Sequence, residues 1–174
     1  MKAILLFLIS FNMVLPVLAS EMTVSLEEKV KSSKHVVIGK VISVTKADKY
    51  PNTAFGDWVK EGVIIELKVF EVFKGHKKYK NVKIHTGIVS ATAGFTGWGV
   101  EKDKEFIAYL KEKEQFLTLA GFSGQYLEPI DRSKNQANDL GQTLTKVKLD
   151  QKILDIEKIT GEEKWHNKSQ QTNR

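Results

Sequence analysis

Histidine, serine and carboxylate side chains are the groups of this chain that could take part in catalysis or metal binding. Their spacing along the sequence matches no complete catalytic or metal-binding motif. A zinc site built on His76 and His85 would need a carboxylate partner that the sequence does not identify. No HExxH motif or other close ligand spacing is present, which favours ordinary surface histidines at all four positions, His35, His76, His85 and His166. We therefore expect no metal site and no cofactor.

Nucleophilic and acid–base catalysis are not favoured either. Ser123 lies in Gly-Phe-Ser-Gly, which resembles half of a G-x-S-x-G motif, but that motif needs the strand–turn–helix context of a parallel α/β sheet. The paired acids Glu27/Glu28 and Glu162/Glu163 lie at expected helix ends, where solvation and the helix dipole explain them. The sequence predicts no catalytic residue, and an envelope hydrolase is the least favoured function.

Length and composition indicate one domain with a hydrophobic core. The chain has 174 residues, of which 41% are hydrophobic and 28% charged. It has no cysteine, which excludes disulfide scaffolds, cysteine zinc sites and thiol catalysis. The net charge of +6 comes from scattered lysines and not from a basic stripe, so we expect no nucleic-acid partner. Such lysines keep a β-rich surface soluble and protect its edges.

Residues 1–19 have the pattern of a secretory signal peptide. Lys2 precedes an apolar run, and a small-x-small sequence ends at Ala19, so cleavage is expected before Ser20. The alternative is a transmembrane anchor, but polar residues and Pro16 interrupt a run that is already short for spanning a bilayer. We expect an exported protein, periplasmic or secreted, without a transmembrane segment.

The hydrophobic pattern of the rest of the chain predicts five strands between two helices. Ser25–Glu28 form a capping box, so a short helix is expected to begin there and to end near Ser33. Apolar residues recur at helical spacing from Leu149 to Ile156, and Gly161 is a typical helix end. Runs of β-branched or alternating apolar residues predict strands at residues 35–45, 62–74, 82–85, 106–110 and 117–119.

The two long strands carry signals for bends. Gly39 lies within the first, and in the second the apolar positions change phase after Val69, so that Phe70 and Val72 are expected to be buried and Glu71 exposed. Bent strands of this length favour a closed structure over a flat sheet. The predicted fold is therefore mainly β, a small five-stranded Greek-key barrel of the oligonucleotide/oligosaccharide-binding (OB) kind with a short N-terminal and a C-terminal helix.

The expected organisation follows from these elements. A signal peptide over 1–19 precedes an OB-like barrel domain over 20–130, in which Gln125–Leu127 adds a short edge strand. A helical extension over 131–163 and a polar tail over 164–174 complete the chain.

Two long loops, at residues 46–61 and 87–104, carry the aromatic residues that could recognise a partner. Loops of this length are uncommon unless they bind something or are disordered. The alternative is that their aromatic side chains fold back and close the barrel ends. As a binding surface they would contribute the predicted partner-binding residues Tyr50, Phe55, Trp58, Phe95 and Trp98.

The order of motifs over roughly residues 25–128 resembles a known family. These motifs are Leu26-Glu27-Glu28, Val37-Ile38-Gly39-Lys40-Val41, the run from Val69 to Gly75, the run from Val82 to Thr86 and the run from Glu105 to Leu110. The chain resembles bacterial exported domains similar to the N-terminal domain of tissue inhibitors of metalloproteinases, an OB-fold of the netrin-like kind. That resemblance implies metalloprotease inhibition as one possible function.

The family's cysteines are missing here. Where the family has Cys-Gly before the fourth strand and Cys after the fifth, this chain has Ala93-Gly94 and about Ala120-Gly121. Its expected mature start, Ser20-Glu21, lacks the cysteine that animal inhibitors place on the protease zinc. We therefore expect first a non-enzymatic binding module for a protein, peptide or glycan, and second an inhibitor-like protein. A structural accessory domain is a third possibility.

Overall fold

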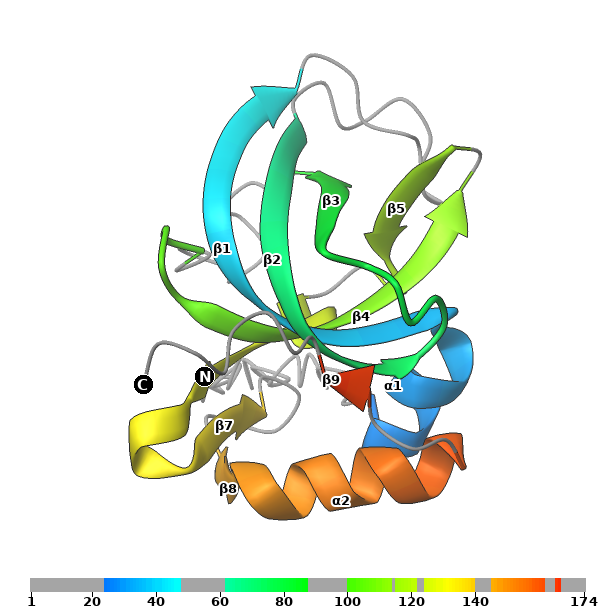
Figure 1. Ribbon diagram of the computed structural model, residues 1–174, viewed down its shortest axis with the longest axis vertical. Coiled ribbons are helices and arrows are strands. Elements are labelled where there is room, and N and C mark those ends of the chain that lie inside the picture. Colours follow the sequence, from blue (N-terminus) through cyan, green and yellow to red (C-terminus); the bar gives the residue numbers. More distant parts are fainter. Residues whose placement is uncertain are drawn as a thin grey trace, which may run out of the picture.

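The computed structural model describes residues 24–47, 62–87, 100–113, 115–121, 124–139, 145–161 and 165–166. These residues form a mainly β structure with two α-helices, as the sequence predicts (Figure 1). The elements are α1 (Leu26–Ser32), β1 (His35–Ala47), β2 (Gly62–Lys74), β3 (Asn81–Gly87), β4 (Glu105–Lys113), β5 (Phe116–Leu119), the 3-10 helix η2 (Gly124–Tyr126), β6 (Leu127–Asp131), the 3-10 helix η3 (Arg132–Lys134), β7 (Gln136–Asp139), β8 (Thr145–Lys148), α2 (Leu149–Thr160) and β9 (Trp165–His166).

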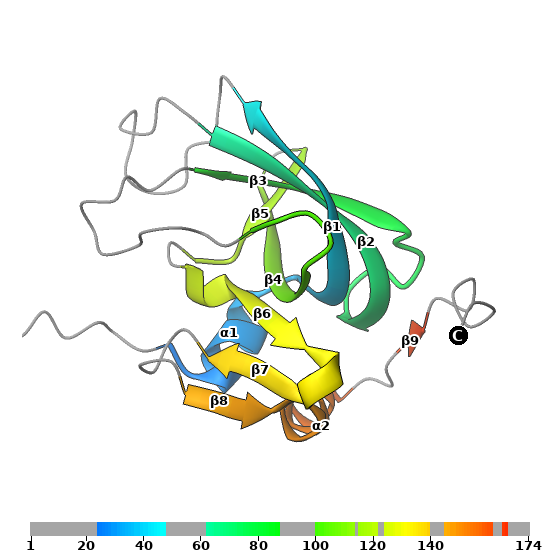
Figure 2. The ribbon, with the colours of Figure 1, turned by 90° about the vertical axis from the view of Figure 1, so that its left-hand side faces the viewer.

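Five of the strands form a ring. β2 pairs antiparallel with β1 and with β3, and β4 pairs antiparallel with β5 and with β1. One parallel bridge, between Ile84 of β3 and Leu117 of β5, completes the circuit. From β4 the sheet continues through β6 and β7 to β8, all antiparallel, beneath the ring (Figure 2).

The predicted bends of the long strands are confirmed as β-bulges. Ile38 pairs with Glu71 whereas Gly39 pairs with Val69, so Phe70 is an extra residue on β2. This is the place where the apolar pattern of β2 changes phase, because an extra residue moves all later side chains to the other face. The predicted exposure of Glu71 is wrong: its residue exposure is 6%, because it pairs with Arg132 from a part of the chain beyond the predicted barrel.

Gly39 is required by the close approach of β1 and β2. A Cβ atom at this position would lie 2.8 Å from the carbonyl oxygen of Lys68 and 3.2 Å from the Cβ of Leu67. The strand therefore bends at the one residue type that leaves room for its neighbour.

β4 is buried on both of its faces. Phe106, Ala108 and Leu110 alternate with Ile107 and Tyr109, and all five are buried. α1 and η2 contact β4 on the side away from the ring interior, and β6 continues the sheet beside it (Figure 2). Alternation on a strand thus does not distinguish a half-buried strand from one enclosed by two layers.

The region after residue 124 differs from its prediction. Gln125 belongs to η2, and the strand that follows is β6, which is not an edge strand, because β4 and β7 flank it. β7 pairs with β6 only at Ile130 and Asp131, so Pro129 lies outside that ladder. The polar stretch after residue 131 contains β7, and β8 follows before α2, where only helical structure was expected.

Both predicted helices are confirmed. The Ser25 hydroxyl accepts a hydrogen bond from the backbone N–H of Glu28, and α1 ends before Ser33. α2 ends at Gly161, whose φ of 63° is the left-handed conformation typical of a helix C-terminus. Neither helix of the described residues is long and apolar enough to span a bilayer.

Substitution of Gly39 by Ala is expected to lower the free energy of unfolding by about 1–3 kcal/mol, because the added methyl group must displace the β2 backbone. Urea unfolding measures the change. The control is Leu154→Ala at an exposed α2 position, expected to change stability by less than about 0.5 kcal/mol. A Gly39→Ala variant as stable as the control would contradict this account of the bulge.

Candidate functional site

The first aromatic-rich loop has both of its ends at one end of the ring, and the second loop leaves the ring from the same end. Ala47, the last residue of β1, pairs with Gly62, the first residue of β2, and Gly62 pairs in turn with Gly87 at the end of β3. Residues 48–61 connect the first pair, and residues 88–99 leave from the third strand (Figure 1). We call this end of the ring, formed by Ala47, Gly62 and Gly87, the loop end.

The predicted partner-binding residues lie outside the described residues. This holds for Tyr50, Phe55, Trp58, Phe95 and Trp98. The structure instead describes the strand ends from which both loops leave, and the geometry of the candidate site is given by those ends.

Side chains next to the loop end are partly apolar and exposed. Val44 is 42% exposed, although it pairs with the buried Ile65. Two residues further on, exposed Lys46 lies opposite Val63, which packs partly against the core. Apolar surface therefore extends from the core to the strand ends, beside a lysine that could contact an anionic or polar group.

The second loop is also fixed where it rejoins the ring. The backbone N–H of Asp103 donates to the carbonyl of Val41 at 2.9 Å, and the N–H of Val41 donates to the carbonyl of Lys104 at 2.9 Å. The Asp103 carboxylate pairs with Lys40 at 2.9 Å, and the hydrogen bond from Lys40 lowers the pKa of Asp103. The second loop therefore leaves the ring at Gly87 and is held again at Asp103 and Lys104, beside Val41 within β1.

A buried charged cluster, formed by Lys29, Glu128, Lys152 and Tyr109, lies on the opposite side of β4 from the ring interior. The ammonium groups of Lys29 and Lys152 each lie 2.7 Å from a different oxygen of the Glu128 carboxylate, and the Tyr109 hydroxyl donates to the second oxygen at 3.1 Å. All four residues are at most 4% exposed. The cluster joins α1, α2, β4 and β6, and its burial keeps it from any ligand in solvent.

A second ionic group connects β2, β4 and η3. Arg132 donates through Nη2 to Glu71 at 2.8 Å and through Nε to Glu105 at 2.7 Å. Burial alone would lower the pKa of the Arg132 guanidinium, but the two carboxylates outweigh it and raise the pKa. Next to it, hydrogen bonds from Ser133 and Lys134 lower the pKa of Asp131 to about 2.

These paired groups line a polar groove of about 610 Å³ beside β6. Two ion pairs lie in its lining, Lys134 with Asp131 and Arg132 with Glu105. We therefore regard the groove as part of the ionic framework of the fold.

The histidines are not all on the surface. The His35 ring is buried, with Nε2 3.0 Å from the Glu112 carboxylate, so the prediction of a surface position was wrong. Hydrogen bonds from Lys34 and His35 lower the pKa of Glu112. His85 is half-buried against Phe116, and burial, with Lys83 nearby, lowers its pKa.

Metal-binding and nucleophilic chemistry gain no support from these positions. Across the described parts of the chain, His, Cys, Asp and Glu form no group of three or more that could hold a metal ion. Ser123 and the side chain of His166 lie outside the described residues.

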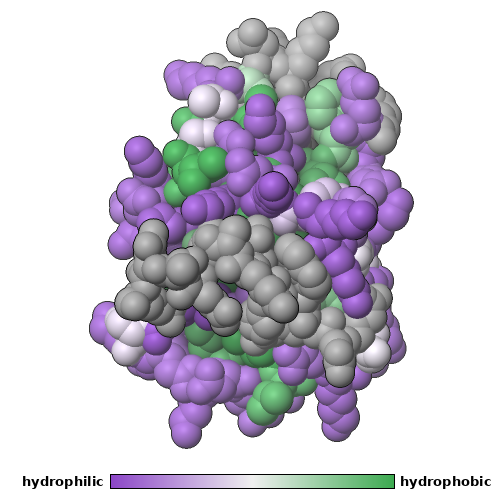
Figure 3. All heavy atoms as spheres, in the orientation of Figure 1, coloured by the Kyte–Doolittle hydropathy of each residue, from purple (hydrophilic) through white to green (hydrophobic). Residues whose placement is uncertain are grey.

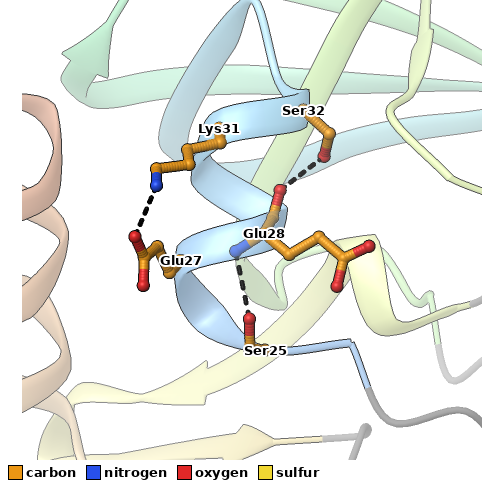
Figure 4. A pocket seen from close by; sticks show the side chains of 5 residues that line it. All are labelled: Ser25, Glu27, Glu28, Lys31 and Ser32. Carbon is orange, nitrogen blue, oxygen red and sulfur yellow. Dashed lines mark hydrogen bonds and ion pairs between the residues drawn. The ribbon is translucent and has the colours of Figure 1, made fainter.

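Two surface hollows involve the helices. One lies along the exposed side of α1 (Figure 4), where the Ser25 hydroxyl accepts from the backbone N–H of Glu28 and Lys31 pairs with Glu27. The other, about 420 Å³, lies between α1 and the start of α2. On the face shown in Figure 3, the described residues present small apolar areas separated by hydrophilic side chains.

Comparison with known proteins gives no further guide. No protein-family model and no curated protein sequence matches the chain.

Glu128→Gln is expected to lower the free energy of unfolding by about 3–5 kcal/mol, because two buried ammonium groups lose the carboxylate that they share. Urea or thermal unfolding of the purified variant measures the loss. Glu27→Gln is the matched control: it removes an exposed carboxylate that also pairs with a lysine, and we expect nearly unchanged stability. Equal stabilities of the two variants would show that the buried cluster does not hold the helices to the sheet.

Proposed function

We propose that the chain is an exported, non-enzymatic binding module that engages a protein, peptide or glycan with the aromatic loops of an OB-like barrel. The observation that carries this proposal is the pairing of Ala47 with Gly62 and of Gly62 with Gly87, which places both ends of the first loop and the start of the second loop at one end of the ring. The proposed contacts are Tyr50, Phe55, Trp58, Phe95 and Trp98.

The strand ring supports the barrel part of the proposal. Five strands whose pairings return to β1, two of them long and bent by bulges, are compatible with an OB-like Greek-key barrel. Loops at the end of such a rigid frame can be presented to a partner without cost to the core. The proposed signal peptide over residues 1–19 would deliver the module, starting at Ser20, to the periplasm or to the outside of the cell.

The chemistry of the loops and of the loop end favours a partner with an apolar or stacking surface. Aromatic side chains bury much area at low conformational cost and stack on sugar rings or fill apolar pockets. Exposed Val44 and Lys46 at the strand ends would add an apolar and a cationic contact.

The test is affinity capture from envelope and culture fractions with the chain from Ser20 to Arg174. We expect Trp58→Ala/Trp98→Ala to abolish capture, because it removes the two largest proposed contacts. Leu154→Ala, which removes an exposed apolar side chain on α2, is expected to capture as the parent does. The thermal midpoint of each variant is measured beside the capture.

The outcomes separate the functions. Lost capture with an unchanged midpoint supports a loop-borne binding site. If the double variant instead loses several kcal/mol of stability, the aromatic side chains cap the barrel and the proposal is wrong. A captured secreted metalloprotease, slowed in a dose-dependent way only when the chain begins at Ser20, would favour the second candidate. That candidate is an inhibitor-like protein, which the strand ring and the family resemblance support.

A further inference from the structure

The edge of β2 is only partly covered by β3. The β2–β3 ladder runs from Gly62/Gly87 to Lys68/Asn81, and the last contact is the hydrogen bond from the Val69 N–H to the carbonyl of Lys80. β2 continues to Lys74, whereas the chain before β3 turns away over residues 75–80. On that side, the stretch of β2 after Val69 has no partner in β3.

Two residues of the C-terminal tail, Trp165 and His166, pair with part of this stretch. β9 pairs antiparallel with β2, with His166 opposite Glu71 and Trp165 opposite Val72 (Figure 1). The other side of the same two β2 residues pairs with Ile38 and Val37 of β1. The tail therefore adds a strand to the one side of β2 that the ring leaves open, which is β-strand addition within a single chain.

We propose that the edge of β2 at Glu71 and Val72 is a strand-acceptor site whose occupant is the tail of this chain, in cis within one molecule and in trans from a second copy. The site is separate from the proposed loop surface, because Gly62 and Val72 lie at opposite ends of β2. Its ligand is an extended, proline-free segment that runs antiparallel to β2.

The pairing is suited to exchange. A two-residue strand provides few backbone hydrogen bonds, so its occupancy depends on the high effective concentration given by the short connection from Gly161 to Trp165. An uncovered strand edge is a template for pairing with another chain, and an identical segment from a second molecule fits it equally well. The acceptor side is rigid, because Val72 is buried and Glu71 is held by Arg132.

The experiment uses a fluorescent peptide of residues 162–174 and the chain from Ser20 to Arg174. In the protein, Trp165→Pro/His166→Pro prevents β9 from pairing, since proline has no N–H and is poorly tolerated in a strand ladder. We expect the peptide to bind this variant at least about tenfold more tightly than it binds the parent, whose own tail competes. Fluorescence anisotropy measures the binding.

Two controls make the result specific. A peptide carrying the same two prolines is expected not to bind, whereas a peptide with Gln171→Pro, outside β9, is expected to bind as the parent peptide does. Hydrogen exchange of the parent and variant proteins gives an independent readout, with faster exchange expected in peptides that cover residues 69–74 of the variant.

Equal binding of the peptide to parent and variant, or binding that survives the two prolines in the peptide, would overturn the proposal. Unchanged exchange at residues 69–74 would overturn it as well. If the variant does not fold, the parent protein is titrated with excess peptide. The peptide is then expected to displace the tail and to raise hydrogen exchange at Trp165 and His166. Unchanged exchange at these two residues would contradict the proposal.

Discussion

The arrangement of the two helices against β4 depends on the ion pairs and the hydrogen bond of one buried carboxylate, that of Glu128. Glu128 follows η2 on β6, and its two oxygens receive Lys29 from α1, Lys152 from α2 and the hydroxyl of Tyr109 from β4. Burial of an unpaired carboxylate or ammonium group costs several kcal/mol. The Glu128 carboxylate and the two lysine ammonium groups can therefore be buried only when they lie next to one another. This requirement fixes the position of both helices relative to the outer face of β4.

The two sides of β4 are stabilised by different interactions. Below β4, the buried cluster and the Arg132 group hold α1, α2 and the extension β6–β8 in place. Above β4, the ring is held by strand pairing and by its apolar interior, and it ends at the strand ends that carry the loops (Figure 2). The helices and ion pairs below β4 stabilise the fold, and we propose that the loop end above it binds the partner.

The sequence predicts most of the ring and both helices, but not the strands β7 and β8 beneath the ring. Alternation and phase are local signals, so the bounds of β2 and its bulge after Val69 could be found from the residues alone. The burial of Glu71 could not be predicted from the local sequence, because it depends on Arg132, which lies 61 positions away. Strands β7 and β8 are short and polar, and only their pairing in the sheet makes them strands.

The buried lysines did leave a signal in the sequence. Lys29 lies three residues after Leu26 and next to Val30, and Lys152 lies three residues after Leu149 and next to Ile153, so each falls on the apolar face of its helix. A charge at such a position indicates a buried partner, although its spacing cannot identify that partner as Glu128. For the aromatic residues of the two loops, the sequence suggests a role in recognition, but the structure describes only the strands to which the loops are attached.

The central claim is that the partner binds at the loop end of the ring. Hydrogen exchange of the chain from Ser20 to Arg174, measured with and without the captured partner, tests it most directly. We predict that protection is confined to peptides covering residues 44–62 and 87–104, with α2 and β8 unchanged. Protection at α2, at β8 or at residues 129–136, with none in those two segments, would contradict the account.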